Sequence, residues 1–137
     1  MFLLDANVLS EMQKLSSNVG VVSFLQSTPA TQLFISSTTL SELSYGIYKL
    51  DKGKKQTGLL HNLTSLRASF AGRILPYSEA VALRYGELMA QQEKRGLNDD
   101  VFDTMLIAQA LIERMSVVTR NRKHFENRGI KVLNPFV

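Results

Sequence analysis

The amino-acid sequence predicts an α/β protein in which helices cover both faces of a central, mostly parallel sheet of four to five strands. Short apolar runs alternate with helical patterns along the whole chain, which is typical of strands joined by crossover helices. The first run, Met1–Leu4, stops at Asp5, and a helical pattern follows at once. We therefore expect Asp5 at the carboxyl edge of the sheet, where α/β proteins bind their ligands. A length of 137 residues predicts a single domain.

The first half of the chain supplies two of the expected strands. A helix is expected from Ala6, and apolar positions in 19–26 predict a second, short amphipathic helix. The apolar run 32–36 predicts the second strand. The hydroxyl residues 37–39 are N-cap candidates for a helix that continues to about Leu50.

The second half continues the alternation. A helix is expected over 56–70, followed by a very short strand at 74–75 that Pro76 closes. Ser78 is expected to cap a helix that runs to about Arg95 and ends at a glycine. The remaining expected elements are an apolar helix, a strand, a short helix and a last strand, over 101–115, 116–119, 121–127 and 130–133.

Composition narrows the class of protein. The chain has no cysteine, which excludes disulfides and thiolate metal sites and predicts a cytoplasmic protein. The first apolar run is too short for a signal peptide or a membrane helix, so no membrane association is expected. A net charge of +4 and a pI near 9.5 mildly favour a polyanionic partner.

Four polar residues interrupt the pattern at strand ends or helix starts: Asp5, Glu42, Asp103 and Asn121. Each has a simple local explanation. Asp5 and Asn121 suit helix N-caps, Glu42 completes a capping-box spacing with Thr39, and Asp103 suits the first turn of its helix. Asp103 nevertheless begins a stripe of apolar residues, where an isolated carboxylate is costly.

The shared position of these residues predicts a common site. The carboxyl ends of parallel strands meet at one edge of a sheet, where three carboxylates repel one another and raise their pKa values. A divalent cation would relieve that repulsion, and oxygen-only ligands favour Mg²⁺ or Mn²⁺. Such a site suits phosphate esters, because the ion activates a water molecule and neutralises charge at phosphorus. Gly46, one turn after Glu42, predicts that another helix or strand passes close by.

With these motifs in place, the sequence resembles PIN-domain ribonucleases of the VapBC toxin–antitoxin type, and within them the FitB-like toxins. The resemblance runs from end to end. Its motifs are Leu4-Asp5-Ala-Asn7-Val8-Leu-Ser10-Glu11, Thr39-Leu-Ser-Glu42-Leu-x-x-Gly46, Phe70-Ala-Gly-Arg73-Ile-Leu-Pro76, Asp103-x-x-Leu-Ile-Ala-x-Ala110, Val118-Thr119-Arg-Asn121 and Val132-Leu-Asn134-Pro135-Phe136.

The resemblance implies a metal-dependent endoribonuclease, with Mg²⁺ or Mn²⁺ as cofactor. Asp5, Glu42 and Asp103 match the family's first three acids, with Asp5 and Asp103 on the metal and Glu42 on the metal or the attacking water. Many relatives carry a fourth acid where this chain has Asn121, so Asn121 is assigned to a water or the scissile phosphate. Asp99 and Asp100 are weaker candidates for additional negative charge.

The resemblance also implies partners. These are an RNA substrate, a small DNA-binding antitoxin of the VapB or FitA kind, and a second copy of the chain, in a homodimer or a larger toxin–antitoxin assembly. The basic segments 120–124 and 52–55 are candidates for contacts with RNA phosphates, or are simply solvated surface. The main alternative is a non-catalytic PIN-fold module that binds protein. A dinucleotide-binding enzyme is disfavoured because no G-x-G-x-x-G follows the first strand.

Overall fold

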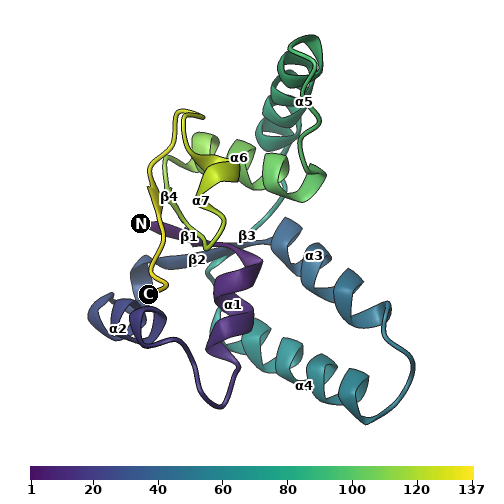
Figure 1. Ribbon diagram of the computed structural model, residues 1–137, viewed down its shortest axis with the longest axis vertical. Helices are drawn as coiled ribbons and strands as arrows, with labels where there is room; N and C mark the ends of the chain where they lie inside the picture. The colour runs from purple at the N-terminus through teal and green to yellow at the C-terminus, as the bar shows by residue number, and fades with distance from the viewer.

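A computed structural model describes residues 1–137, and its centre is a five-stranded sheet in which all paired strands are parallel (Figure 1). The strands lie in the order β3-β2-β1-β4-β5. Their bounds are Phe2–Leu4 for β1, Leu33–Ser36 for β2, Ile74–Leu75 for β3, Ser116–Val118 for β4 and Val132–Leu133 for β5. The predicted parallel α/β architecture is confirmed, with the N-terminal strand at the centre of the sheet.

Seven α-helices and one 3₁₀ turn connect the strands. Their bounds are Ala6–Met12 for α1, Val19–Ser27 for α2, Ala30–Gln32 for the 3₁₀ turn η1, Ser37–Tyr48 for α3, Lys54–Ser69 for α4, Glu79–Lys94 for α5, Val101–Glu113 for α6 and Arg122–Phe125 for α7. None of them is long and apolar enough to cross a membrane.

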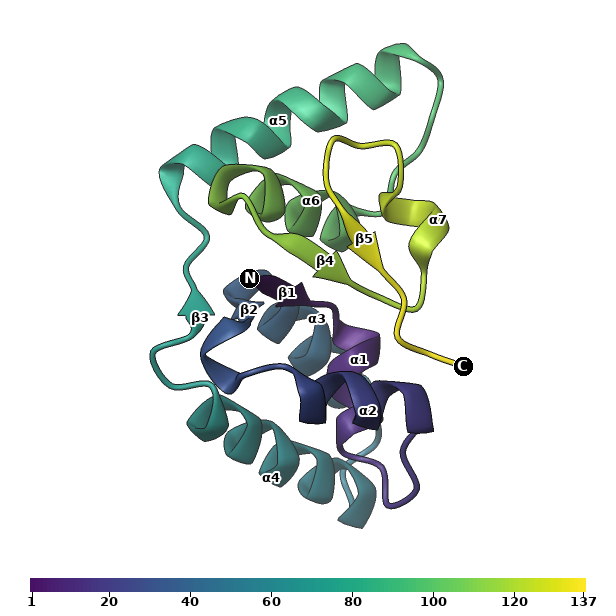
Figure 2. The same cartoon turned by 90° about the vertical axis from the view of Figure 1, so that its left-hand side faces the viewer.

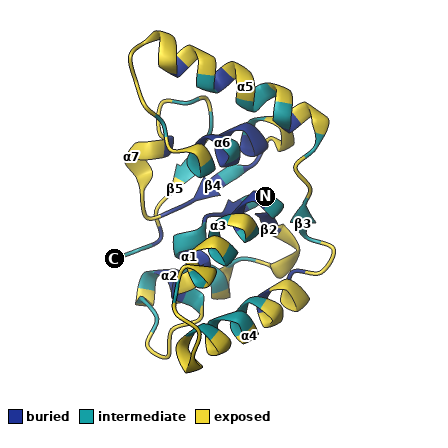
Figure 3. Cartoon of the chain, turned by 90° about the vertical axis from the view of Figure 1, so that its right-hand side faces the viewer, coloured by how far each residue is buried: buried dark blue, intermediate teal, exposed yellow.

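The helices form two layers with the sheet between them (Figure 2). Successive side chains of a strand point to opposite faces, so Leu3 and Leu4 enter different cores, as do Val117 and Val118. The core on one face is built with α5, α6 and α7, and the core on the other with α1, α2 and α4. Figure 3 shows the buried strands between helices whose outer faces are exposed. The predicted α/β/α layering is therefore confirmed.

The start of α3 differs from the sequence prediction. Ser36, the last residue of β2, is the N-cap, and its Oγ accepts a hydrogen bond of 3.1 Å from the backbone N–H of Thr38. The expected caps at 37–39 are already helical, so the capping box between Thr39 and Glu42 does not form. A strand that passes directly into a helix leaves no loop residue to act as the cap.

The close approach expected at Gly46 is also absent. A Cβ at Gly46 would meet no atom of this chain within 4 Å. The close approach occurs at Gly20 in α2, where a Cβ would collide with the carbonyl oxygen of Pro135. The chain's C-terminal segment crosses α2 there, and Asn18 Nδ2 donates to the carbonyl oxygen of Val137 at 2.9 Å.

Candidate active site

Asp5 stands where β1 passes into α1, and three donors hold its carboxylate. Its Oδ1 accepts from the backbone N–H of Ala6 at 2.8 Å, and its Oδ2 accepts from Thr119 Oγ1 at 2.7 Å and Asn7 Nδ2 at 3.3 Å. Burial raises the pKa of Asp5, and the hydrogen bonds from Thr119 and Ala6 partly offset that rise. Asp5 is thus both the helix cap expected from its position and a buried, oriented carboxylate.

Thr119 connects the end of β4 to this carboxylate. Its side chain is fully buried, and its hydroxyl donates to Asp5 while accepting from the backbone N–H of Asn121 at 3.0 Å. Asn7 strengthens the connection, because its Oδ1 accepts from the backbone N–H of Arg120 at 3.1 Å. The start of α1 and the segment after β4 are therefore fixed together around Asp5.

Glu42 lies in the second turn of α3 and differs from the other acids in having no donor. No hydrogen bond or ion pair holds its half-buried carboxylate. Burial is the first cause that raises its pKa, to about 7, and the negative charges of Asp5, Asp103 and Asp100 are the others. Glu42 is therefore close enough to these three aspartates to be repelled by them.

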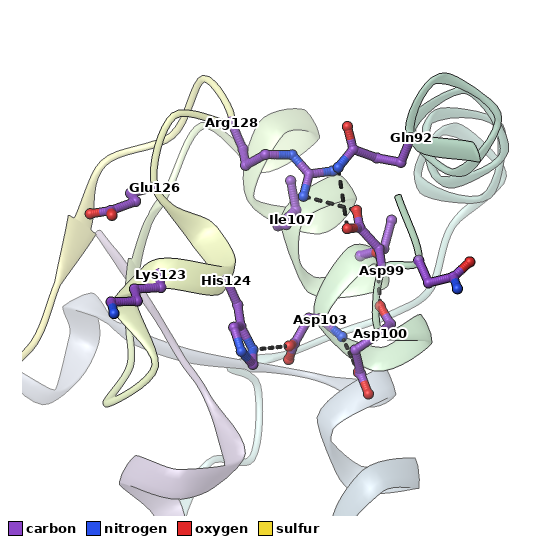
Figure 4. A pocket seen from close by; sticks show the side chains of 11 residues that line it. Gln92, Asp99, Asp100, Asp103, Ile107, Lys123, His124, Glu126 and Arg128 are labelled. Atoms are coloured by element: carbon purple, nitrogen blue, oxygen red, sulfur yellow. Dashed lines mark hydrogen bonds and ion pairs between the residues drawn. The ribbon is translucent and has the colours of Figure 1, made fainter. Parts of the chain in front are cut away.

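Asp103 is in the first turn of α6, where its backbone N–H donates to Oδ1 of the N-cap Asp100 at 2.9 Å. Its own Oδ2 lies 2.8 Å from Nδ1 of His124, which α7 carries (Figure 4). Burial raises the pKa of Asp103, and the hydrogen bond with His124 lowers it in part. The Asp103 carboxylate faces a polar cavity of about 390 Å³ between the end of α5, the start of α6 and α7.

Asp99 and Asp100, the weaker candidates, separate in the structure. Asp100 caps α6 and contributes negative charge to Glu42 and Asp103. Asp99 faces Arg128, with Oδ2 and Nη1 3.0 Å apart, and its Oδ1 accepts from Gln92 Nε2 at 3.2 Å (Figure 4). Asp99 therefore forms an ion pair that joins the loop between α5 and α6 to the segment after α7.

Asn121 is linked to Asp5 through the hydroxyl of Thr119. Its backbone N–H is tied to Thr119, but its exposed side chain lines a separate hollow together with Arg120, Arg122 and Lys123. That hollow shares Lys123, His124 and Glu126 with the cavity at Asp103. The structure thus brings Asp5, Glu42 and Asp103 into electrostatic contact and leaves the amide of Asn121 at their margin.

The three acids do not form a ready-made metal cluster. No group of three or more Asp, Glu, His or Cys side chains has an arrangement that could hold a metal ion as it stands. Hydrogen bonds occupy oxygens of Asp5 and Asp103, and only the Glu42 carboxylate is without a donor.

Sequence reasoning missed the roles of two residues. Thr119 ends the fourth predicted strand, 116–119, but nothing local in the sequence identifies Asp5, 114 positions away, as its acceptor. His124 was assigned to a basic surface cluster, and its contact with Asp103 depends on where α7 docks against α6. No sequence pattern signals either contact, because both join residues far apart in the chain.

Comparisons with known proteins agree with this architecture. The family model described as the PIN domain matches residues 2–131. The plasmid stability protein StbB of Pseudomonas syringae is 35% identical and the toxin FitB of Neisseria gonorrhoeae 34% identical, each over 137 residues and 99% of both chains. The VapC ribonuclease Y4jK of Sinorhizobium fredii is 30% identical, covering 99% of this chain and 98% of its own.

Solved structures of related proteins have the same fold. The crystal structure of FitAcB from Neisseria gonorrhoeae superposes with a TM-score of 0.85 at 34% identity, covering 98% of both chains. The structure of FitAB bound to a DNA fragment has the same TM-score and identity. With a family match across almost the whole sequence, the chain belongs to the PIN domain family.

Proposed function

We propose that this protein is a metal-dependent endoribonuclease, the toxin of a toxin–antitoxin pair, and that Asp5, Glu42 and Asp103 form its catalytic centre. The observation that carries the proposal is the Glu42 carboxylate. It is half-buried, has no donor and is repelled by three aspartates. Such an arrangement is unfavourable in the protein alone, and perturbed acids of this kind cluster at functional sites. The similarity to a VapC ribonuclease and to the toxin FitB supports the reaction class.

The donor set fits a hard divalent cation. Carboxylate oxygens are the ligands that Mg²⁺ and Mn²⁺ prefer, and the site offers no thiolate. We assign Asp5, Glu42 and Asp103 as the residues that would hold the ion. When bound, such an ion supplies a more acidic water and offsets negative charge at the phosphorus.

The chain's own residues then divide the remaining work. Thr119 and Asn7 orient the Asp5 carboxylate, and His124 orients that of Asp103. Glu42 is assigned to hold the ion or to accept a proton from the attacking water. Asn121, at the margin of the acids, is assigned to a water or the scissile phosphate.

The partners of the relatives extend the proposal. The solved FitAB structure pairs the FitB toxin with FitA and a DNA fragment. We propose that this chain likewise binds a cognate antitoxin of the FitA or VapB kind, and that it forms a homodimer or a larger assembly with it. The antitoxin is expected to suppress RNA cleavage when the two proteins are expressed together.

Replacement of Asp103 by Asn tests the catalytic assignment. The change keeps the size of the side chain and its contact with His124 but removes a negative charge, so Mg²⁺-dependent RNA cleavage should fall by at least about 100-fold. Glu93→Gln is the matched control, because Glu93 is exposed near the end of α5 and belongs to no ion pair. Cleavage is followed on a labelled single-stranded RNA with and without EDTA. Wild-type rates for Asp103→Asn would show that the assignment is wrong.

The alternative is a non-catalytic module that binds protein through the same fold. It predicts no metal-dependent cleavage by the wild-type protein, and equal antitoxin binding by the wild-type and Asp103→Asn proteins. The cleavage assay described above therefore separates the two functions.

A further inference from the structure

A glutamine is fully buried in α6, the helix that carries Asp103. A buried amide without partners is costly, so the hydrogen bonds of Gln109 indicate what it does. Its Oε1 accepts from Ser36 Oγ at 3.2 Å, and its Nε2 donates to the carbonyl oxygen of Pro76 and to Glu113 Oε1, each at 3.4 Å. The side chain of Gln109 therefore joins α6 to the ends of β2 and β3.

Ser36 connects Gln109 to the helix that carries Glu42. The Ser36 side chain is fully buried, and its hydroxyl donates to Gln109 while accepting from the backbone N–H of Thr38 at 3.1 Å. One hydroxyl group thus bonds α6 on one side and the first turn of α3 on the other. No other hydrogen bond or ion pair joins α3 or its N-cap to α6.

The position of Glu42 depends on this contact more than the positions of the other two acids do. Asp5 accepts a hydrogen bond from the side chain of Thr119. Asp103 contacts the ring of His124. The Glu42 carboxylate has no donor, so the backbone of α3 alone determines where it lies.

The acids lie close enough to the shared hydrogen bond to be sensitive to it. Glu42 follows Ser36 by six residues, and Asp103 precedes its own anchor in α6 by the same number. At about 1.5 Å per residue, each acid lies roughly 9 Å from the bond along its helix. A rotation of α3 by about 10° at Ser36 would then move Glu42 by roughly 1.5 Å. Functional groups need to be held within about 0.5 Å, so a small change at the bond is enough to disturb the site.

Core packing alone does not explain an amide at this position. The other α6 side chains in the core on this face of the sheet are apolar: Leu106, Ile107, Ala108 and Ala110. Leucine has nearly the volume of glutamine and would bury more apolar surface. A buried hydrogen bond is directional, however, and favours one arrangement of the two helices that it joins. Gln109 therefore contributes a fixed geometry between α3 and α6.

We propose that Gln109 is a positioning residue for the candidate metal site. Through the hydroxyl of Ser36 it fixes the start of α3 against α6, and the separation between Glu42 and Asp103 follows from that contact. Gln109 itself touches neither the ion nor the RNA. The inference rests on the proposed nuclease function, in which the two acids share an ion, and adds the contact that holds them at the required separation.

Binding of Mn²⁺ alone tests the inference without RNA. Free Mn²⁺ is measured by electron paramagnetic resonance while the wild-type and Gln109→Leu proteins are titrated. Gln109→Leu should lower Mn²⁺ affinity by about 10-fold, the lower end of the range for residues that orient metal ligands. RNA cleavage at one subsaturating Mn²⁺ concentration should show a lower kcat and an unchanged KM, because Gln109 does not touch the substrate.

A double-mutant cycle checks that Gln109 acts through Ser36. If it does, the protein with both Ser36→Ala and Gln109→Leu should bind Mn²⁺ no more weakly than Ser36→Ala alone. Losses of affinity that multiply would show that the two residues act independently, and the inference would be wrong. Hydrogen exchange of the Thr38 amide should also rise by about 5-fold or more in Gln109→Leu, because the hydroxyl that accepts from it loses its anchor.

Two control variants separate positioning from a general loss of stability. Ser78→Ala removes the N-cap of α5, where Ser78 Oγ accepts from the backbone N–H of Val81 at 3.3 Å. Leu88→Ala removes volume from the core on the α6 face of the sheet. Both should lower the free energy of unfolding and leave Mn²⁺ affinity within about twofold of the wild type. An equal loss of Mn²⁺ affinity in Leu88→Ala and Gln109→Leu would identify general loosening as the cause and overturn the inference.

The outcomes distinguish this inference from the function on which it rests. Circular dichroism first confirms that each variant is folded. If the wild-type protein binds Mn²⁺, Asp103→Asn does not, and Gln109→Leu binds like the wild type, only the positioning inference is wrong. If the wild-type protein binds no Mn²⁺, the proposed metal site and its positioning residue both fail.

Discussion

At the scale of single residues, burial and mutual repulsion raise the pKa values of the acids in the candidate site, and hydrogen bonding lowers them. Asp5 and Asp103 each have a side-chain partner that favours their ionised form, Thr119 for one and His124 for the other. Glu42 has no such partner, and its pKa rises to about 7. Glu42, the acid without a hydrogen-bond donor, is therefore the one whose ionisation lowers the stability of the metal-free protein most.

Glu42→Gln should stabilise the metal-free protein near pH 8 and leave its stability near pH 4 unchanged. A folded-state pKa of about 7, above the ordinary 4.5, means that the folded protein holds this proton more tightly than the unfolded chain. Wild-type stability therefore declines as pH rises from about 4.5 to about 7, by about 1 kcal/mol after allowance for solvent screening.

Urea denaturation in EDTA across this pH range measures the effect. Asp5 and Asp103 titrate in both proteins, so the difference between the two curves isolates Glu42. Parallel curves would show that Glu42 is not repelled by its neighbours. The same variant should lose cleavage activity. Glu42 would then be a residue that lowers the stability of the metal-free protein and is nevertheless required for cleavage.

Thr119→Val should reduce cleavage by about 10-fold to 100-fold while the fold is retained. Valine has the shape of threonine, but it cannot donate to Asp5 or accept from the backbone N–H of Asn121. A loss of about 1–3 kcal/mol in the free energy of unfolding is expected, because buried polar groups lose their partner.

Thr104→Val is the matched control for this variant. Thr104 is equally buried, and its hydroxyl donates to the backbone oxygen of Asp100, with no link to Asp5. It should lose similar stability and keep more activity than Thr119→Val. Equal activity losses in the two variants would remove the special role of Thr119.

At the scale of elements, a helix end is where the backbone adopts an unfavourable conformation. The C-cap of α6, Arg114, adopts the left-handed conformation with φ of 57°. This region disfavours residues other than glycine. Gly96, after α5, has φ of +74° and suits it. The early end of α6, two residues before its predicted one, brings Ser116 into position to begin β4.

Arg114→Gly should raise the free energy of unfolding by about 0.5–1 kcal/mol, because glycine enters the left-handed region freely. Gly96→Ala is the opposite control and should lower it by about 1 kcal/mol. Thermal denaturation followed by circular dichroism measures both. A destabilised Arg114→Gly variant would indicate that the arginine side chain contributes more than its backbone costs.

The sequence predicted every strand and every α-helix because apolar periodicity is a local property. It also placed Asp5 correctly at the carboxyl end of the first strand, because a buried run that ends in a carboxylate is visible without knowing any partner. The N-cap of α3 was misplaced because Ser36 serves as both strand end and cap. The contacts of Thr119 and His124 were out of reach for another reason: they depend on docking between elements that sequence spacing does not encode.

At the scale of the whole molecule, the C-terminal segment packs against the start of α2, which lies early in the chain. The Asn18 side chain, which caps α2, also receives the backbone N–H of Val137 at 3.2 Å and donates to its carbonyl oxygen. Arg120 covers the ring of Phe136, with Cζ 5.0 Å from the centroid. The C-terminal segment therefore seals the face of the sheet on which α1 and α2 pack.

Gly20→Ala should destabilise the protein by about 1–3 kcal/mol, because the new methyl group would collide with the carbonyl oxygen of Pro135. Gly58→Ala in α4 is the control: it has open space, and the gain in helix propensity should stabilise it by up to about 1 kcal/mol. Chemical denaturation compares the two. A Gly20→Ala variant as stable as the wild type would show that the C-terminal segment yields easily.

The order of the strands determines how late in synthesis on the ribosome the contacts of Asp5 can form. β1 is synthesised first yet lies between β2 and β4, and the hydrogen bond from Thr119 to Asp5 joins positions 114 residues apart. A nascent chain therefore carries Asp5 without its donor, and Asp103 without His124, until almost all of the sequence has emerged. Asp5 and Asp103 can therefore reach the contacts described above only after residue 124 has left the ribosome.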